Sequence, residues 1–330
     1  MRYSVSIIVP MYNVQQFVEK CARHLLEQTM ENIEIIFIDD CSPDESSAIV
    51  SRVLERYPSR KPHVKIIRHK MNKGLPSARN TGLVVASGEY VFHCDGDDWL
   101  ETEAIERLYN AAKTNNADIV WCDWYLSFQN NERYMSQDPG SASLTSVASV
   151  ELLLAGKIRY NVWNKLVKTS LYKDHNLHFP DGHGMGEDMA MIKVFAYAQK
   201  VVYLPQALYH YVQLNNDAFT KKMTAQHLED IKYNVDTTIH FIRGIYGDNM
   251  DMFVQFFKLN VKLPFLISTD VESYERWLAW YPEANAFIDA NPMFSNRAKF
   301  IQKTALRRQF WILKLYYYLI IRVVYGLIYK

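Results

Sequence analysis

Three carboxylates stand within four residues at Asp95-Gly96-Asp97-Asp98, directly after the apolar run at residues 90–94. Carboxylates this close repel one another unless a cation compensates their charge. Proteins commonly hold Mg²⁺ or Mn²⁺ with one or two carboxylates and the phosphates of a substrate. The segment therefore predicts a divalent-metal site that a diphosphate ligand completes. A solvated acidic turn that begins the next helix is the alternative, because a motif of four residues is weak by itself.

Polar residues follow other apolar runs as well. Asp39-Asp40 ends a second run, and either aspartate alone would be an ordinary turn residue. Polar segments also occupy residues 10–13 and 72–82, each after a further apolar run. If the runs are neighbouring strands, these segments and the carboxylates after residue 94 could meet in one cleft.

The elements that would position these loops are short strands that alternate with amphipathic helices up to about residue 124. Such alternation is typical of a mostly parallel sheet covered by helices. Open sheets of this kind bind ligands at the carboxyl ends of their strands, so the polar loops are expected at a binding edge. The predicted strands are residues 6–10, 34–39, 64–68, 90–94 and 118–124.

Four segments in the first 215 residues agree with a known pattern in order and approximate spacing. They read V-S-I-I-V-P-M-Y-N, E-I-I-F-I-D-D-C-S-P-D, N-K-G-L-P-S-A-R-N-T-G and G-E-Y-V-F-H-C-D-G-D-D-W. The chain thereby resembles glycosyltransferase family 2, inverting enzymes of the GT-A fold, which implies an α/β domain with a Rossmann-like mixed sheet covered by helices. The family usually has Gly where Cys41 stands and often Ser where Gly96 stands. Since both positions lie in loops, we expect altered backbone detail and intact chemistry.

The resemblance implies a nucleotide pocket at the strand ends. Asp40 would accept a hydrogen bond from the base ring. Asp95 would face the ribose and Asp97 the metal, and this D-x-D pair would hold Mn²⁺ or Mg²⁺. Of the other expected donor-binding residues, Pro10, Tyr12 and Asn13 would shape the base pocket, and Lys73, Arg79 and Asn80 would lie near the base and ribose.

Gly186-Glu187-Asp188 resembles the acceptor-side E-D motif of the family, whose final aspartate is the general base. Asp188 is therefore the expected catalytic residue, and Glu187 is the nearest rival unless its charge only complements a helix dipole. The implied reaction is a single displacement that inverts the anomeric carbon. The metal would offset the charge of the leaving diphosphate, and the base would take the proton of the acceptor hydroxyl.

We expect a hexosyltransferase whose donor is a nucleotide-diphosphate sugar, with uridine diphosphate as the expected carrier. A saccharide or a lipid-linked saccharide would be the acceptor, in surface polysaccharide or glycolipid assembly. A sugar nucleotidyltransferase is one alternative, but it needs a glycine-rich loop where Met11-Tyr12-Asn13 stands. A non-catalytic sugar-binding or scaffold protein is the other, because a fold does not guarantee activity. Retention of the acidic loops and of the candidate base argues against it.

Several weaker signals concern single segments. S-P-D-E at residues 42–45 predicts a helix start with Ser42 as N-cap. The polar stretch 129–146 predicts a mobile loop. Trp163, in the segment W-N-K, would line the acceptor side or belong to the core. His210 could approach the metal or the diphosphate, and a plain strand histidine is the alternative.

Composition and length agree with a folded enzyme. The 330 residues suffice for one large domain or two unequal ones, and 49% hydrophobic with 22% charged residues is the balance of a globular protein. The four cysteines include no close pair with metal-ligand spacing, so a reducing compartment fits best. We expect a catalytic domain at residues 1–220 and a helical C-terminal region at residues 221–330.

The C-terminal region ends in a basic, aromatic segment. A spanning helix needs about 20 largely apolar residues, and charges interrupt this one, so we expect an amphipathic helix that lies on an anionic membrane. A helix packed on its own domain or on a second subunit is the alternative, which leaves oligomerisation open. Because no signal-peptide pattern begins the chain, the expected location is cytoplasmic, peripheral at the inner face of the membrane, and no nucleic-acid partner is expected. No acidic residue follows Asp289, whereas Arg297, Lys299, Lys303, Arg307, Arg308, Lys314, Arg322 and Lys330 do.

Overall fold

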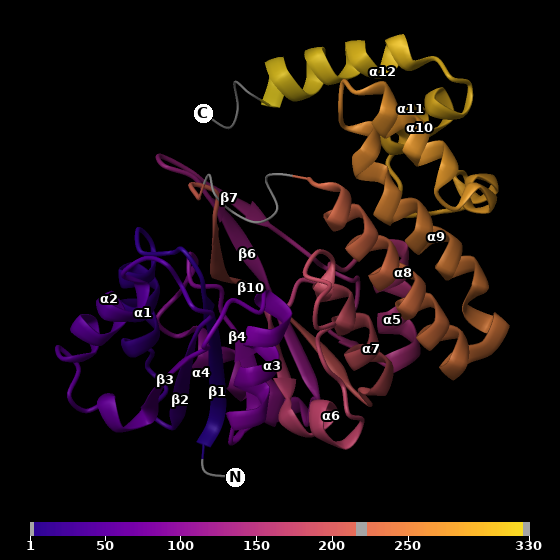
Figure 1. Cartoon of the computed structure of the whole chain (residues 1–330). Helices are drawn as coiled ribbons and strands as arrows, with labels where there is room; N and C mark the ends of the chain where they lie inside the picture. The colour runs from indigo at the N-terminus through magenta and orange to yellow at the C-terminus, as the bar shows by residue number, and fades with distance from the viewer. Residues whose placement is uncertain (1–2, 216–222, 326–330) are drawn as a thin grey trace. The chain divides into compact units, whose positions relative to one another are not determined.

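The computed structural model describes residues 3–215 and 223–325 (Figure 1). The chain divides into two compact units, Met1–Ser149 with Tyr160–Thr238, and Val150–Arg159 with Ile239–Lys330. The domain boundary that the sequence predicts, between residues 220 and 221, lies outside the described residues. The first unit is an α/β layer structure and the second is helical, as expected from the sequence.

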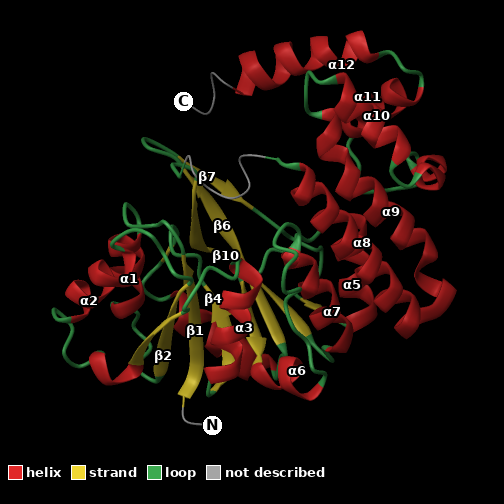
Figure 2. Ribbon diagram, viewed as in Figure 1, coloured by secondary structure: helices red, strands yellow, loops and turns green. Residues whose placement is uncertain are grey.

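A mixed sheet forms the first unit (Figure 2). Its main order is β3-β2-β1-β4-β9-β6-β10-β5, with β7 paired to β6 and β8 to β10. β1 pairs in parallel with β2 and β4, β2 with β3, and β6 with β10, whereas β9 is antiparallel to both β4 and β6. The carboxyl ends of β1, β2, β3, β4, β6 and β10 therefore lie at one edge. The strands are β1 (Tyr3–Met11), β2 (Ile33–Asp39), β3 (Val64–Arg68), β4 (Gly88–His93), β5 (Trp99–Leu100), β6 (Ile119–Ser127), β7 (Glu132–Met135), β8 (Ser143–Leu144), β9 (Lys165–Lys168) and β10 (Val201–Val212).

Helices cover both faces of this sheet. Val5, Ile7 and Val9 of β1 share a fully buried cluster with residues of α1, α2 and α4. Ile8 points to the opposite face, where a Cβ on Gly82 of α3 would lie 2.3 Å from its Cγ2, so the absence of a side chain at Gly82 lets α3 pack this closely. The helices of the first unit are α1 (Val18–Leu26), α2 (Ser46–Leu54), α3 (Leu75–Val85), α4 (Ala104–Asn115), α6 (Thr169–Asp174) and α7 (Ala190–Tyr197). α5 (Ser146–Ala155) begins in the first unit and ends in the second.

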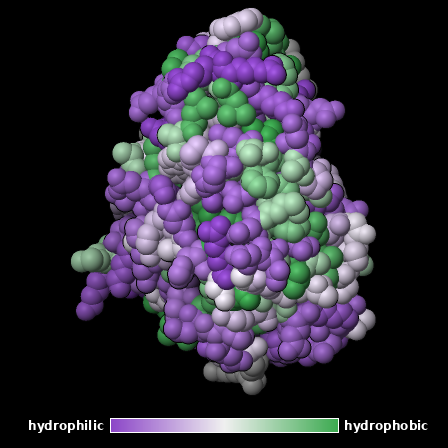
Figure 3. All heavy atoms as spheres, turned by 90° about the vertical axis from the view of Figure 1, so that its right-hand side faces the viewer, coloured by the Kyte–Doolittle hydropathy of each residue, from purple (hydrophilic) through white to green (hydrophobic). Residues whose placement is uncertain are grey.

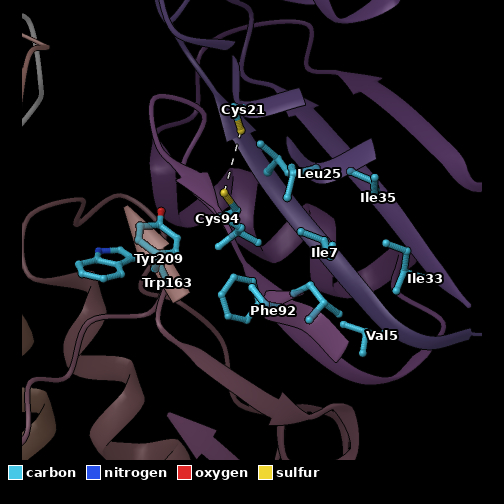
Figure 4. Packing of buried hydrophobic residues seen from close by; sticks show 14 of the residues in the cluster. Val5, Ile7, Cys21, Leu25, Ile33, Ile35, Phe92, Cys94, Trp163 and Tyr209 are labelled. Carbon is cyan, nitrogen blue, oxygen red and sulfur yellow. Dashed lines mark hydrogen bonds between the residues drawn. The ribbon is translucent and has the colours of Figure 1, made fainter. Parts of the chain in front are cut away.

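The core extends to the binding edge of the sheet. Figure 4 shows Cys94, the residue after β4, facing Cys21 of α1, with Tyr209 of β10 and Trp163 alongside. The rings of Trp163 and Tyr209 stack with centroids 4.5 Å apart. Each fully buried aliphatic or aromatic side chain contributes about 1.5–3 kcal/mol. The loops that follow these strands therefore start from rigid, well-packed positions.

Two local predictions were wrong. Ser42 is not an N-cap: α2 begins at Ser46, and the carboxylate of Asp44 accepts from the Ser46 N–H at 3.1 Å. Asp39 Oδ1 accepts from the Ser42 N–H at 2.7 Å, which ties Ser42 into the turn after β2. The predicted loop 129–146 contains β7 and β8, because β6 and β10 offer it unpaired strand edges.

The second unit is built from helices and short 3₁₀ turns. Lys262, fully buried on α9, donates to Trp280 O at 2.8 Å and to Asn285 Oδ1 at 2.7 Å, and thereby joins α9 to the turn after α10. Within the described ranges no helix is long and apolar enough to cross a membrane. Lys330 of the predicted basic tail lies outside those ranges, and the side chain of Arg322 is not among the described ones. The helices are α8 (Ala225–Tyr246), which passes from the first unit into the second, α9 (Asp251–Lys262), α10 (Val271–Ala279), α11 (Asn296–Leu306) and α12 (Phe310–Tyr316), with a π-helical continuation at Tyr317–Tyr325.

Candidate active site

The loop 95–98 is held in place by buried contacts with β10. Asp98, 1% exposed, accepts from the Tyr209 hydroxyl at 2.6 Å and from the Val212 N–H at 2.7 Å. The same hydroxyl accepts from the Asp95 N–H at 3.1 Å. Burial, and then the charge of Asp97, raises the pKa of Asp98 well above its usual range. Asp98 therefore anchors the loop to β10. The other two carboxylates of the loop, Asp95 and Asp97, take no part in this anchor.

The loop also packs tightly on the end of β1. A Cβ on Gly96 would lie 2.9 Å from the carbonyl oxygen of Pro10 and 3.2 Å from Val14 Cγ2. A Ser here, as the family often has, would need the neighbouring backbone to shift. Gly96 thus joins the acidic loop to Pro10, one of the residues predicted to shape the base pocket.

Asp95 and Asp97 each bond to a different partner. Asp95 Oδ1 accepts from Arg79 Nη2 at 3.0 Å, and Asp97 Oδ2 accepts from Asn215 Nδ2 at 2.8 Å. Burial, and then the charge of Asp95, raises the pKa of Asp97. A cation bound beside Asp97 would offset both effects by stabilising its charged form. A cavity of about 170 Å³ adjoins Asp97 and is also lined by Lys20.

The two carboxylates fit a divalent ion that arrives with phosphates. In the part of the chain that is described, no group of three or more His, Cys, Asp and Glu side chains is placed to hold a metal ion. An ion bound by Asp95 and Asp97 would therefore take its remaining ligands from water and from the oxygens of a diphosphate, the usual arrangement for Mg²⁺.

The second acidic pair organises the loops beside β1. Asp40 is 3% exposed, and it accepts from His69 Nδ1 at 2.6 Å and from the N–H groups of Lys73 and Gly74 at 2.9 and 2.7 Å. The structure thus brings Asp40 and Lys73 together through the backbone of Lys73. Nearby, Tyr12 is 51% exposed and presents its ring to solvent.

The turns beside this pair use left-handed backbone. Asn13 has φ 55° and Cys41 has φ 58°. Asn tolerates this region through its short polar side chain, whereas a residue such as Cys pays about 1–2 kcal/mol. This conformation explains why Gly is the usual residue of the family at position 41. The Asn13 N–H donates to Ser42 Oγ at 2.8 Å, which fixes the two turns against each other.

The acceptor-side pair lies on a short 3₁₀ turn. Gly186 has φ 85°, a conformation that favours glycine, and it precedes the turn Glu187–Met189. Glu187, 7% exposed, accepts from Arg79 Nη1 at 2.7 Å. Burial raises the pKa of both Glu187 and Asp188, and their mutual repulsion raises that of Glu187 further. Among the described residues Asp188 forms no ion pair, whereas Glu187 is paired with Arg79, and the charges of Arg79 and Lys165 oppose the effect of burial on the pKa of Asp188.

Arg79 and Asn80 contact the segment at residues 179–189, which contains the Glu187-Asp188 pair and is called the acceptor-side loop below. The two terminal nitrogens of Arg79 bridge Asp95 and Glu187, and the side chain is 2% exposed. Asn80 donates to Phe179 O at 2.9 Å and accepts from the Phe179 N–H at 2.9 Å. The predicted contact of these two residues with base and ribose stays a prediction, because their observed contacts are with the protein itself: Asp95 and Glu187 for Arg79, and the backbone of Phe179 for Asn80.

The weaker candidates have structural surroundings. His210 lies in β10 with its ring stacked on Trp99 at 3.3 Å between centroids, and it bonds to Glu101 at 3.0 Å and Glu132 at 2.8 Å. It is a buried strand histidine, the alternative that the sequence left open. Trp163 is 6% exposed and belongs to the core.

Sequence reasoning missed two residues that hold the acidic loop, Tyr209 and Asn215, and considered Lys165 only as part of the W-N-K segment. Tyr209 and Asn215 fix the acidic loop, and Lys165, fully buried, donates to Asn161 O at 2.6 Å and Asn164 Oδ1 at 2.7 Å. Burial lowers the pKa of Lys165 to about 7. One feature of the sequence could have pointed to Tyr209. In the Y-H-Y segment of β10, strand alternation places Tyr209 on the face opposite His210.

Two relatives found by sequence are named glycosyltransferases. EpsJ of Bacillus subtilis strain 168, named an uncharacterized glycosyltransferase, is 38% identical over 212 residues, which cover 63% of this chain and 60% of EpsJ. The cholesterol galactosyltransferase of Borreliella burgdorferi is 29% identical over 268 residues, 78% of this chain and 73% of that protein. The match thus spans only about 60% of the length of EpsJ.

The fold also agrees with a solved transferase. The crystal structure of S. aureus TarS 1–349 in complex with UDP-GlcNAc superposes with a TM-score of 0.69 at 18% identity, covering 95% of this chain and 91% of that one. At this identity the likeness establishes the fold, which is GT-A. The sequence profile described as glycosyl transferase family 2 matches residues 6–194. Because that profile extends over more than half of the chain, from the first strand to the helix after Asp188, this chain belongs to glycosyltransferase family 2.

Proposed function

We propose that the chain transfers a sugar from a nucleotide-diphosphate sugar to an acceptor hydroxyl with inversion at the anomeric carbon. The observation that carries the proposal is the meeting of two acidic motifs around one buried arginine: Asp95 of the D-x-D pair and Glu187, the neighbour of Asp188, both bond to Arg79. The UDP-GlcNAc in the TarS structure supports uridine diphosphate as the carrier.

The residues divide the reaction between two sides. Asp97 and Asp95 would hold Mn²⁺ or Mg²⁺ on the donor side, and a divalent ion there supplies Lewis-acid stabilisation of the leaving diphosphate. Pro10, Tyr12 and Asn13 would form the base pocket together with Asp40 and Lys73, whose positions at the same edge support this role. Asp188 would take the proton of the attacking hydroxyl, a role that favours a carboxyl whose pKa burial has raised.

The second unit supports an acceptor at a membrane surface. Trp311, Leu315 and Leu319 are 68%, 49% and 52% exposed, which places an apolar stripe on the outer side of α12 and its continuation. Figure 3, in which α12 lies at the top, shows hydrophobic atoms there beside strongly hydrophilic ones. An exposed apolar stripe in a segment with only basic charges suits the surface of an anionic membrane.

The acceptor would then be a lipid-linked saccharide, a glycolipid or a growing surface polysaccharide. The name of the Borreliella relative, cholesterol galactosyltransferase, supports a lipid-type acceptor. Such a location would be peripheral, at the cytoplasmic face of the membrane where nucleotide-sugars are made.

A donor screen tests the proposal. Purified protein is incubated with a panel of nucleotide-sugars and Mn²⁺ or Mg²⁺, and nucleotide release is measured. We expect release from a UDP-sugar that excess chelator abolishes, and a loss of at least about 10²-fold in Asp97→Ala, the scale of a lost catalytic group. Asp236→Asn, an exposed change on α8, serves as control and should keep full release. Full release in chelator would contradict the metal role, and no release from any donor would favour the scaffold alternative.

A further inference from the structure

Arg79 is the central contact between the two sides of the site. It lies on α3, one turn after the helix begins at Leu75, and is one of the largest fully buried side chains of the chain. Its planar guanidinium donates to Glu187 at 2.7 Å and to Asp95 at 3.0 Å. A guanidinium suits this task because its donors form a rigid fork that can meet two carboxylates at once. The ring of Phe179 lies 5.5 Å from the guanidinium carbon and completes its burial.

The same helix holds the start of the acceptor-side loop. Asn80 makes reciprocal hydrogen bonds with the backbone of Phe179, and Asn80 Nδ2 also donates to Asp181 Oδ1 at 3.1 Å. Ser77 Oγ donates to the same Asp181 oxygen at 2.7 Å. α3 therefore contacts the loop at both ends: near residues 179–181 through Ser77 and Asn80, and at Glu187 through Arg79.

We propose that Arg79 is a positioning residue that sets the place of Asp188 relative to the donor-side carboxylates, with Asn80 as its support at the start of the loop. The inference rests on the proposed function for its kinetic consequences but not for its structural ones. Arg79 acts through Glu187 and Asp95, since at 2% exposure it presents almost no surface to a donor.

Charge balance gives this bridge its importance. Arg79 is the cation that two ion pairs share, with Asp95 at 3.0 Å and with Glu187 at 2.7 Å, and a guanidinium keeps its charge in proteins. Without that charge the buried carboxylate of Glu187 and the half-buried carboxylate of Asp95 would lose the cation that they share. Removing one partner of a buried ion pair leaves an uncompensated charge and destabilises the packed position of the other partner. Movement of the loop would displace Asp188 from the reacting centre.

Two substitutions separate positioning from donor binding. Arg79→Met removes the charge at similar length, and Arg79→Lys keeps the charge but loses the fork. We expect nucleotide release by Arg79→Met to fall by about 10²-fold, the cost of misplacing a reactive group by about 1 Å. The dissociation constant for UDP with Mn²⁺, measured by calorimetry, should weaken far less than turnover falls, because Asp97 and the proposed base pocket do not contact Arg79. Arg79→Lys should recover at least about tenfold of the lost rate. Arg52→Met, an exposed change on α2, is the control.

Hydrogen–deuterium exchange tests the same inference without any activity. Amides of residues 179–189 should exchange faster in Arg79→Met and in Asn80→Ala than in wild type, with the sheet unchanged. If Arg79→Met does not fold, Arg79→Lys and Asn80→Ala give the same readouts with the same expected direction.

Each outcome bears on a different claim. If UDP affinity weakens in parallel with turnover, Arg79 is a donor contact and the inference is wrong. It is also wrong if loop exchange and turnover stay at the wild-type level. A wild-type protein that releases no nucleotide from any donor contradicts the proposed function, while loop exchange still decides the positioning role.

Discussion

The hydroxyl of Tyr209 should contribute more to stability than any exposed hydroxyl that makes the same bond. It donates to Asp98 at 2.6 Å and accepts from the Asp95 N–H at 3.1 Å, in a position where Tyr209 is fully buried and Asp98 is 1% exposed. Tyr209→Phe removes one oxygen and leaves the ring stack with Trp163 in place. The buried carboxyl group then keeps only the Val212 N–H, and the Asp95 amide loses its partner.

The cost follows from those two lost bonds. A hydrogen bond to a charged group contributes about 1.5–3 kcal/mol, and a buried donor left unsatisfied costs about 1–3 kcal/mol. Tyr209→Phe should therefore lower the free energy of unfolding by about 2.5–6 kcal/mol, the sum of the two ranges.

Tyr57→Phe is the matched control. Its hydroxyl also donates to a carboxylate at 2.6 Å, that of Glu27, but the bond is exposed to solvent. Surface changes of this kind usually alter stability by less than about 0.5 kcal/mol. Urea denaturation followed by tryptophan fluorescence measures both variants. Equal effects of Tyr209→Phe and Tyr57→Phe would refute the argument that burial of the Asp98 anchor decides its contribution.

Three further changes test other parts of the structure. Cys41→Gly should raise the free energy of unfolding by up to about 1 kcal/mol, because it relieves the left-handed backbone at φ 58°; a loss of stability in the same urea titration would contradict this. Asp188→Asn should lower nucleotide release by about 10²-fold or more. Burial raises the folded-state pKa of Asp188 above its unfolded value, so the contribution of this carboxyl group to stability is present at low pH and is lost as pH rises through the folded pKa. The Asn variant should therefore be more stable than wild type at pH 8 and lose that advantage towards pH 4. A stability difference that does not change with pH would argue against the burial effect. Changing Trp311, Leu315 and Leu319 together to Ser should abolish sedimentation with anionic vesicles, which for the wild type should weaken with salt and be absent from neutral vesicles; equal sedimentation of both proteins would exclude the exposed stripe as the contact.

The strands and the motifs that follow them could be predicted from the sequence. Runs such as I-E-I-I-F-I-D are apolar on both faces, and a parallel strand covered by helices on both sides needs that composition. The polar residues directly after such runs must then fall at the carboxyl edge of the sheet. Asp40 and Asp95 were located in this way, because their positions depend on local pattern and on strand direction alone.

Local signals failed where a residue had a competing partner. The S-P-D-E segment has the residue types of a helix start, but the carboxylate of Asp39 takes the Ser42 N–H and Asp44 accepts from the first turn instead. Similarly, residues 129–146 are polar enough for a loop, yet the open edges of β6 and β10 pair with them. In both cases the sequence shows which donors and acceptors are present, but not which of them bond to each other.

The sequence by itself determined the family, the sheet and the side chains available at its edge, because these follow from composition, periodicity and order. Only the tertiary structure decided what those side chains do to one another. Arg79 is 108 residues from Glu187, and Tyr209 is 111 residues from Asp98, yet each pair shares a buried hydrogen bond. Burial removes water as a competing partner, so the few protein groups within reach fix the position and the pKa of each carboxylate. Which groups are within reach depends on how α3 and β10 pack against the sheet, and no local pattern records that.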